Sequence, residues 1–391
     1  MSIQLFIGHS GQRLALDSTV TSLDGLRAWV AQHAGIQARS QVLLTAQGKQ
    51  VRQQTLLTET ELFVFDSKLF ASKEPVSLPG VDALDEVTPY NPGTPPDTIA
   101  NQNDLQAWQT LFRSRKSWAS ALLGGCSKLA TQTEEYLDEE AVIARSLGVA
   151  VASLQQHIKS GEKKYNSVVT WADDVLREQE EHVHGWERNL DSLRSVPARP
   201  EFARFLNPAT PVARRSSQQG DTATLQVFVD LAKTRKAANS ARNITEDLTE
   251  RLNGLQAKLE DATKQTDELL QAVDQVNNDT RSYIEAESEA SQLRSEIEIV
   301  VNKISSDLEH VQSLPRTSPS AVQASKMALL HTRNYLPNLS EYCQEMNELV
   351  GRARERRQQV ALAALEHMQI LSSIESRLSQ LYAGIETFGM P

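Results

Sequence analysis

A seven-residue repeat of apolar side chains is the feature that most constrains the fold of this chain. Counting in sevens from Leu252, these positions and their partners three residues later stay in register over nine heptads. Three or four heptads already suffice to predict a coiled coil, so a long paired helix is expected here. We expect the apolar members of the repeat to form a dimer seam, which comprises Leu252, Leu255, Leu259, Leu269, Val273, Val276, Ile297, Val301, Ile304 and Leu308.

The centre of this repeat is polar. The helix that carries the repeat can pair in two ways. Thr280, Glu287 and Arg294 occupy seam positions, a layer that fixes register at a cost in stability. A homodimer held by this helix is favoured, because the repeat keeps strict register. The competing solution is an antiparallel hairpin within one chain, because residues 101–196 form a second helix of nearly equal length.

Two further long helices are predicted on either side of the repeat. Residues 101–196 contain no proline before Pro197 and carry an apolar stripe at helical spacing, with Arg115 as its one polar intruder. A four-residue step between Leu154 and Ile158 is a stutter that locally relaxes a supercoil. Residues 319–391 form the third helix, because a capping serine precedes a first-turn proline at Ser318-Pro319, and Pro337 is expected to kink it.

Residues 1–70 follow a different period. Short alternating strands flank Gly8–Gly11, a helix capped by Ser22 runs to Gly35, and two more strands follow at Val42–Leu44 and Leu62–Phe65. This strand–strand–helix–strand–strand order resembles the β-grasp fold of ubiquitin. Ser67-Lys68-Leu69 follows the last strand in place of a Gly-Gly terminus, so conjugation as a modifier is not expected.

The predicted fold class is mainly α: a small N-terminal β-grasp (ubiquitin-like) domain followed by long coiled-coil-forming helices. Six prolines lie between residues 72 and 100, which predicts a tether, and a basic connector rich in proline follows the first long helix. The expected organisation is a β-grasp domain, a linker, helix one, a connector, heptad helix two and helix three, at residues 1–70, 71–100, 101–196, 197–221, 222–314 and 319–391.

Charge and composition argue against some classes of function. The net charge is −10, which argues against nucleic-acid binding, because phosphates require a basic surface. Two cysteines, Cys126 and Cys343, are expected to be free thiols in a reducing compartment. The longest apolar stretch, Ala141–Leu154, is interrupted by Arg145, so only peripheral membrane association is expected.

Few side chains offer chemistry. His182 and Glu178 have metal-ligand spacing on a helix, but His184 points elsewhere, so a solvated face is expected. Cys126 lies within an apolar stripe and is expected to be a core thiol. We therefore expect no enzyme, catalytic residue, metal or cofactor. The run Arg352–Arg357 is interpreted as a solvated face, with contact to anionic lipid or an acidic partner as the alternative.

Two segments carry a family resemblance. The string Ile3–Gln12, which continues into Gln41–Val51 and Glu59–Asp66, resembles the start of fungal autophagy-related protein 11. Thr224–Asp230 followed by Thr234–Ala238 is similar to the block that opens the first long coil of that family. Members of the family are much longer, so this sequence is expected to correspond to an N-terminal fragment.

The resemblance implies a cytoplasmic, homodimeric scaffold of selective autophagy. Such a scaffold recruits the autophagy-initiating Ser/Thr kinase and its complex, together with a multispanning autophagy membrane protein, to the pre-autophagosomal structure and the vacuole membrane. Cargo receptors bind toward the C-terminal part of the family, beyond the region that this chain resembles. Two alternatives are a membrane-shaping helical-bundle dimer, which would need a basic face, and a ubiquitin-pathway coiled-coil adaptor, which would need the sheet surface around Leu44 and Thr45.

Overall fold

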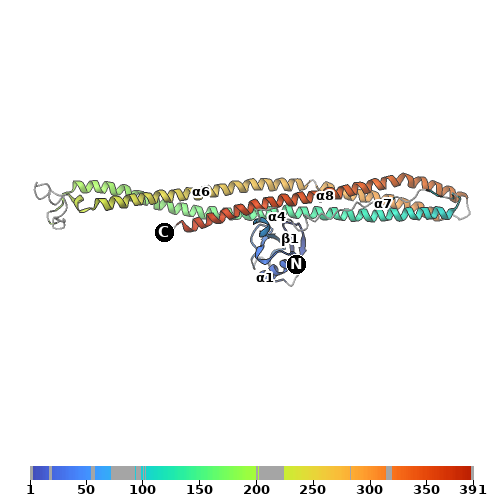
Figure 1. Ribbon diagram of the computed structural model, residues 1–391, viewed down its shortest axis with the longest axis horizontal. Coiled ribbons are helices and arrows are strands. Elements are labelled where there is room, and N and C mark those ends of the chain that lie inside the picture. Colours follow the sequence, from blue (N-terminus) through green and yellow to red (C-terminus); the bar gives the residue numbers. More distant parts are fainter. Residues whose placement is uncertain are drawn as a thin grey trace. The chain divides into compact units, whose positions relative to one another are not determined.

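The computed structural model describes residues 3–16, 20–53, 58–71, 93, 98–99, 101, 103–199, 201, 224–281, 283–313 and 319–388. Almost all of the proline-rich linker and of the basic connector lie outside these ranges. The prediction that the linker is a tether therefore stands as a prediction, and the proline-rich connector lies largely outside the described residues. Within the described residues, long helices dominate and a small sheet lies near the N-terminus (Figure 1).

The N-terminal part is a four-stranded mixed sheet with one covering helix, as the sequence predicts. The strands are β1 (Gln4–Ile7), β2 (Arg13–Ala15), β3 (Gln41–Thr45) and β4 (Glu61–Asp66), and the helix is α1 (Leu23–His33). The strand order is β2-β1-β4-β3, with β1 parallel to β4 and the other pairs antiparallel. A short turn, η1 (Ala38–Ser40), precedes β3, and a short helix, α3 (Ser67–Ala71), follows β4.

Local sequence signals explain where this domain turns. Ser22 caps α1, since its hydroxyl accepts a hydrogen bond from the Gly25 amide at 3.0 Å. Gly35 follows the helix with a φ of +70°, a conformation that costs glycine little. The core between α1 and the sheet contains Leu5, Leu26, Val30, Leu43, Leu62 and Val64, all of them buried.

Four long helices form the rest of the described chain. They are α4 (Leu105–Ser195), α6 (Leu231–Arg281), α7 (Tyr283–Ser313) and α8 (Pro319–Thr387), and Pro337 lies inside α8. The prediction of one continuous helix over residues 222–314 is wrong at its start. The structure has an isolated bridge at Thr224 and a short turn, η3 (Leu225–Phe228), in place of the first helical turns.

The chain divides into two compact units, and helices α4, α6 and α8 each contribute to both. Unit 1 contains Met1–Gln155 and Thr266–Ser373, whereas unit 2 contains Gln156–Gln265 and Ile374–Pro391. Each unit has its own packing.

Unit 1 packs α4, α7 and α8 around shared apolar layers. One layer joins residues 118–130 of α4, 290–304 of α7 and 339–350 of α8, and a second joins residues 105–112, Leu308 and residues 321–329. These matches make α8 parallel to α4 and α7 antiparallel to both. Arg115, the polar intruder in the α4 stripe, is fully buried, and burial together with nearby Arg333 lowers its pKa to about 10.

Unit 2 pairs α4 with α6 in the antiparallel direction. The Tyr165 hydroxyl lies 3.5 Å from Oε1 of Gln256, and the Leu225 amide donates to the carbonyl of Val196 at 3.0 Å. The last turns of α8 join this pair, because the Tyr382 hydroxyl donates to the carbonyl of His157 at 2.7 Å. Helix one and helix two therefore pair within one chain in this unit.

Candidate functional site: the sheet–helix junction and the seam of α6 and α7

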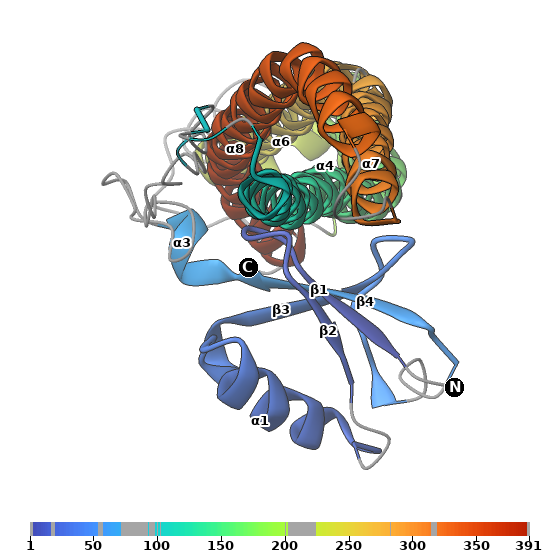
Figure 2. The same cartoon turned by 90° about the vertical axis from the view of Figure 1, so that its right-hand side faces the viewer.

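The open face of the β-grasp sheet, opposite α1, carries a patch of large apolar side chains. Period-two alternation sends Phe6, Leu44, Phe63 and Phe65 to this face, whereas their neighbours Leu5, Leu43, Leu62 and Val64 face α1. All four side chains are buried, and Phe6 stacks on Phe63 with ring centroids 5.1 Å apart. Figure 2 shows α1 on one side of the sheet and α4 on the other.

Arg145 of α4 is the main polar contact of this face. Its guanidinium lies 5.2 Å from the ring centre of Phe63 and 5.6 Å from that of Phe6, which is cation–π geometry. The same group forms a bidentate ion pair with Glu61, with Nη1 3.2 Å from Oε1. This arginine, which interrupts the apolar stretch of α4, therefore contacts the open face of the sheet.

Two turns of the domain touch the α4 backbone, and both require glycine. Gly11 and Gly48 have φ values of +75° and +76°. A Cβ atom on Gly11 would lie 2.2 Å from the carbonyl oxygen of Glu139, and one on Gly48 would lie 2.7 Å from the Ser153 amide nitrogen. Only a residue without a side chain permits this approach. Together with the open-face contacts, these turns define the docking junction between the β-grasp domain and α4.

The arginine run of α8 is largely paired within unit 1. Arg357 forms an ion pair with Glu139 of α4, Arg356 lies 3.7 Å from the buried Glu140, and Arg352 lies 3.1 Å from Glu289 of α7. The interpretation of a solvated face is therefore wrong for Arg356 and Arg357, whereas Arg352 is exposed, as that interpretation predicts. Burial raises the pKa of Glu139, and the positive charge of Arg357 opposes that shift.

A cavity of about 480 Å³ lies where the sheet, α4 and α8 meet, and it is part of unit 1. Its lining includes Ile7, Ile36 and Leu69 together with His9, Asp66 and Arg357. Burial lowers the pKa of His9, and nearby Asp66 opposes that shift. Within the described residues, no group of three or more His, Cys, Asp or Glu side chains is arranged to bind a metal ion.

The seam residues predicted from the heptads are largely buried inside one chain. In unit 1, six of them are buried: Leu269, Val273, Ile297, Val301, Ile304 and Leu308. In unit 2, Leu255 and Leu259 are buried, whereas Leu252 is half-buried, as is Val276 of unit 1. Eight of the ten residues are therefore buried within the chain. Whether a second copy contacts this face stays a prediction.

The polar centre of the repeat departs from the predicted register. Arg294 is exposed, and its neighbour Leu293 is buried in its place beside Ile297 and Val300. An arginine at that position would leave a charge in an apolar layer, so the buried face shifts by one residue. The side chains of Thr280 and Glu287 lie outside those that the structure describes.

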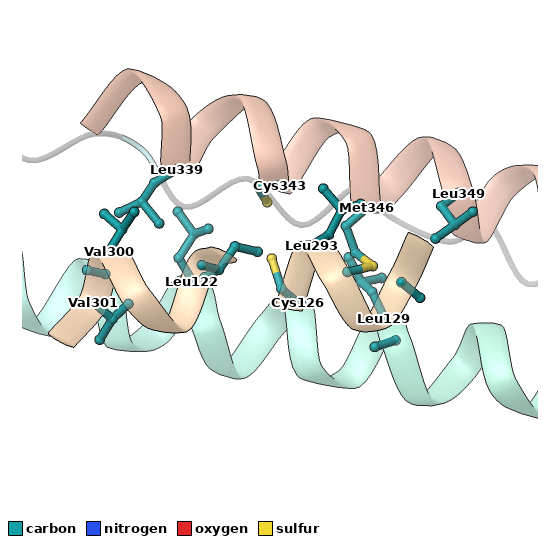
Figure 3. Close-up of a cluster of buried hydrophobic side chains, with 14 of the residues drawn as sticks. Leu122, Cys126, Leu129, Leu293, Val300, Val301, Leu339, Cys343, Met346 and Leu349 are labelled. Carbon is teal, nitrogen blue, oxygen red and sulfur yellow. The ribbon is translucent and has the colours of Figure 1, made fainter. Parts of the chain in front are cut away.

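The structure also shows the environment of the cysteines and histidines that the sequence offered as candidate sites. Cys126 is a buried core thiol, as predicted, and it shares its layer with Cys343 (Figure 3). His182 and His184 are exposed on α4, as are Glu178 and Glu181. No described helix combines the length and the apolar character needed to span a bilayer.

The helical part of the chain matches a known family, and most of the chain is similar to curated proteins. Residues 98–389 match the family described as "Autophagy protein ATG17-like domain". The chain is 34% identical over 346 residues to autophagy-related protein 11 of Aspergillus fumigatus, a match that covers 88% of this chain and 26% of the relative. The protein of the same name from Emericella nidulans is 32% identical over 342 residues, covering 88% of this chain and 25% of the relative.

A third relative extends the match over most of the chain. Autophagy-related protein 11 of Neurospora crassa is 31% identical over 382 residues, covering 96% of this chain and 26% of the relative. The chain spans about a quarter of the length of these curated relatives. The resemblance to fungal autophagy-related protein 11 that the sequence indicates is confirmed. Because the family model covers all four long helices, the chain belongs to the autophagy protein ATG17-like domain family.

Proposed function

We propose that this chain is a scaffold of selective autophagy that self-associates and presents autophagy-initiation factors to one another. The observation that carries the proposal is the match of all four long helices to the ATG17-like domain, together with relatives named autophagy-related protein 11. The partners proposed are the initiating Ser/Thr kinase complex and the multispanning autophagy membrane protein, and cargo receptors are assigned to regions of the relatives that this chain does not match. The proposed location is cytoplasmic, at the surface of the pre-autophagosomal structure and the vacuole.

The packing supports a structural role for the helices. Helices α4, α7 and α8 bury their apolar stripes against one another in unit 1, and the described surface of that bundle is polar apart from single exposed residues such as Ile299 and Leu362. Extended helical surfaces of this kind present many separate contacts to partner proteins. The β-grasp domain is docked on α4 through the junction defined above and adds a second kind of surface.

Two observations weigh against the alternative functions. An adaptor that binds ubiquitin receptors would need the sheet surface around Leu44 and Thr45, but both side chains are buried. A membrane-shaping bundle would need a free basic face, but three arginines of the α8 run are paired with acids of α4 and α7.

We propose that self-association uses the start of α6, from Ile244 to the first seam residue, Leu252. Ile244 is 57% exposed and Leu252 is half-buried, so apolar surface remains there for a second copy. The buried seam residues, by contrast, already have partners within the chain. An Ile244→Asp chain should therefore dissociate without losing its fold, whereas Leu259→Asp should destabilise the fold itself, because it places a carboxylate in a buried layer.

Sedimentation equilibrium on the 391-residue chain tests self-association. The wild type should be a dimer at micromolar concentration, and Ile244→Asp should be a monomer whose thermal transition is unchanged. A wild-type monomer at that concentration would contradict the dimer. A dimer that persists in Ile244→Asp would place the interface elsewhere.

Partner recruitment needs a separate experiment. The immobilised chain should retain the initiating kinase complex from a filamentous-fungal lysate, measured by quantitative mass spectrometry against a Leu259→Asp bait of equal amount. Equal recovery of that kinase on both baits would show that recovery does not depend on the folded helices, and absence of the kinase from both would contradict the proposed partner.

A further inference from the structure

The two cysteines of this chain are neighbours in the core of unit 1. They are its only cysteines, and 217 positions separate Cys126 from Cys343 in the sequence. Nevertheless α4 and α8 bring them into one buried layer as free thiols. Figure 3 shows the two side chains pointing toward one another between these helices. The rest of the layer is apolar and includes Trp118 and Met346 beside aliphatic side chains, and a free cysteine packs in such a layer as a small apolar residue.

The surroundings make the two thiols unequal. The Cys126 thiol donates a hydrogen bond to the sulfur of Cys343, which raises the pKa of Cys126 and lowers that of Cys343. Nδ2 of Asn347, one turn further along α8, lies 3.9 Å from the same sulfur. Cys343 is therefore the thiol of the pair that is more readily deprotonated, and thiolates are the nucleophiles of cysteine chemistry.

The helices that hold the thiols contain residues that weaken them locally. Gly124 lies two residues before Cys126, and a Cβ atom there would meet nothing within 4 Å, so packing does not require the glycine. A glycine inside a helix destabilises it relative to alanine. In α8, Pro337 removes one backbone hydrogen bond less than two turns before Cys343. Both thiols are almost fully buried, so an oxidant reaches them when these turns open.

We propose that Cys126 and Cys343 form a redox modification site, at which a hydroperoxide-class oxidant converts the two thiols into an intrachain disulfide that joins α4 to α8. The Cys343 thiolate attacks one oxygen of hydrogen peroxide, the O–O bond breaks, and protonation of the departing hydroxide releases water and leaves a sulfenic acid. The Cys126 sulfur then attacks the Cys343 sulfur, the S–OH bond breaks, and a second water leaves with the Cys126 proton. Overall, two thiols are oxidised by two electrons and one peroxide is reduced to two waters.

The disulfide would cross-link two helices of unit 1 and raise its thermal stability. A disulfide requires the sulfurs to move from hydrogen-bond contact to about 2.05 Å, a short approach for two side chains that already face one another. It would tie helices α4 and α8 together across a long loop, which restricts the unfolded chain more than a short loop does. The oxidised chain should therefore unfold at a higher temperature than the reduced chain.

The test treats the reduced, native 391-residue chain with hydrogen peroxide, removes the peroxide with catalase, and alkylates the remaining thiols after unfolding. Intact mass spectrometry should show the loss of two hydrogen atoms and no alkylation, and digestion should yield one peptide pair that links Cys126 to Cys343. Two alkylated thiols in the treated chain would overturn the proposal. So would a disulfide that joins two chains, which non-reducing electrophoresis detects.

Three variants separate the proposed route from general oxidation. Cys343→Ser should form no intrachain disulfide under the same treatment, because the partner sulfur is absent. Gly124→Ala should slow disulfide formation about fivefold, the factor expected for a helix-interior glycine replaced by alanine. Gly254→Ala is its matched control, since a Cβ atom there also meets nothing within 4 Å but Gly254 belongs to α6 in unit 2. Equal rates for Gly124→Ala and the wild type would overturn the local-opening route.

Discussion

The two units bury their helices to different depths. In unit 1, α7 is enclosed by α4 and α8 and places Leu293, Ile297 and Ile304 in the core. In unit 2, residues 173–195 of α4 and 231–254 of α6 include no buried side chain among those described. An antiparallel pair covers each apolar stripe from one side only, whereas a third helix closes the layer. The buried fraction of an apolar stripe therefore depends more on how many helices surround the stripe than on the residues that form it.

The largest effect is expected from truncating the enclosed core. Ile297→Ala removes a fully buried side chain and should lower the free energy of unfolding of unit 1 by about 2–5 kcal/mol. Val183→Ala, at a half-buried position of unit 2, should cost less than about 1 kcal/mol. Urea unfolding followed by circular dichroism measures both. Equal losses would remove the distinction between the units.

The second effect concerns the docking junction. Gly48→Ala adds a Cβ atom 2.7 Å from the α4 backbone and also strains a backbone with φ of +76°, so the β-grasp domain should leave α4. Gly35→Ala is the matched control, because its φ is +70° but its Cβ atom would meet nothing within 4 Å. Both share a backbone strain of about 1–2 kcal/mol.

Hydroxyl-radical footprinting reads the difference between these two variants. Labelling of Phe6 and Phe63 should rise strongly in Gly48→Ala and stay at the wild-type level in Gly35→Ala. If both rings remain protected in Gly48→Ala, the open face is covered by something other than docking on α4.

A smaller effect is expected from Arg145. Arg145→Met keeps the aliphatic stem but removes the cation–π contacts and the ion pair with Glu61, so we expect a loss of about 1 kcal/mol for this partly exposed group. Glu61→Gln should lose less, and the double variant should lose less than the sum of the two single losses, because both act through one contact. Additive losses in this double-mutant cycle would show that the two residues act independently.

The smallest effect is a pH dependence in unit 2. Nδ1 of His157 lies 2.6 Å from Oε1 of Glu375, and this hydrogen bond raises the pKa of the histidine despite its partial burial. A raised pKa means that the pair stabilises the fold fully below the ordinary value of 6.5 and loses this contribution as the pH rises through the raised value. Both groups are partly exposed, so screening by solvent keeps the contribution below about 1 kcal/mol.

Melting curves at a series of pH values test this dependence. The Tm difference between wild type and Glu375→Gln should shrink as the pH rises above 6.5. Glu366→Gln, which removes an exposed carboxylate from the same helix, should show no such trend. A difference that grows with pH would contradict the assigned charge state.

The sequence predicts elements and faces better than it predicts partners. Period-two alternation and positive-φ glycines specify the β-grasp domain, and the heptads specify the buried face of α6 from Leu255 to Val273. A heptad stripe does not say which helix covers it, so the sequence leaves the antiparallel α4–α6 pair and a homodimer open and does not predict the parallel α4–α8 pair. The one-residue shift at Arg294 has another cause, because an arginine at that position would leave a charge in an apolar layer.

The sequence contains few indications of the docking junction. Arg145 stands out as a charge in the apolar stretch of α4, and the structure shows that it contacts the open sheet face. The adjacent acids Glu139 and Glu140 match the adjacent arginines Arg356 and Arg357, but nothing in either segment marks the other as its mate. Contacts of this kind depend on the lengths of the helices and on how they pack against one another. The local pattern of apolar residues does not determine either.

Hydrogen exchange measured by mass spectrometry tests most directly whether a third helix sets the depth of burial. The whole chain should be measured at a concentration at which sedimentation shows a monomer. Amides of residues 290–304 in α7 should exchange many-fold more slowly than those of residues 235–250 in α6, because exchange follows the free energy of local opening. Equal protection of the two segments, or greater protection in α6, would contradict the account.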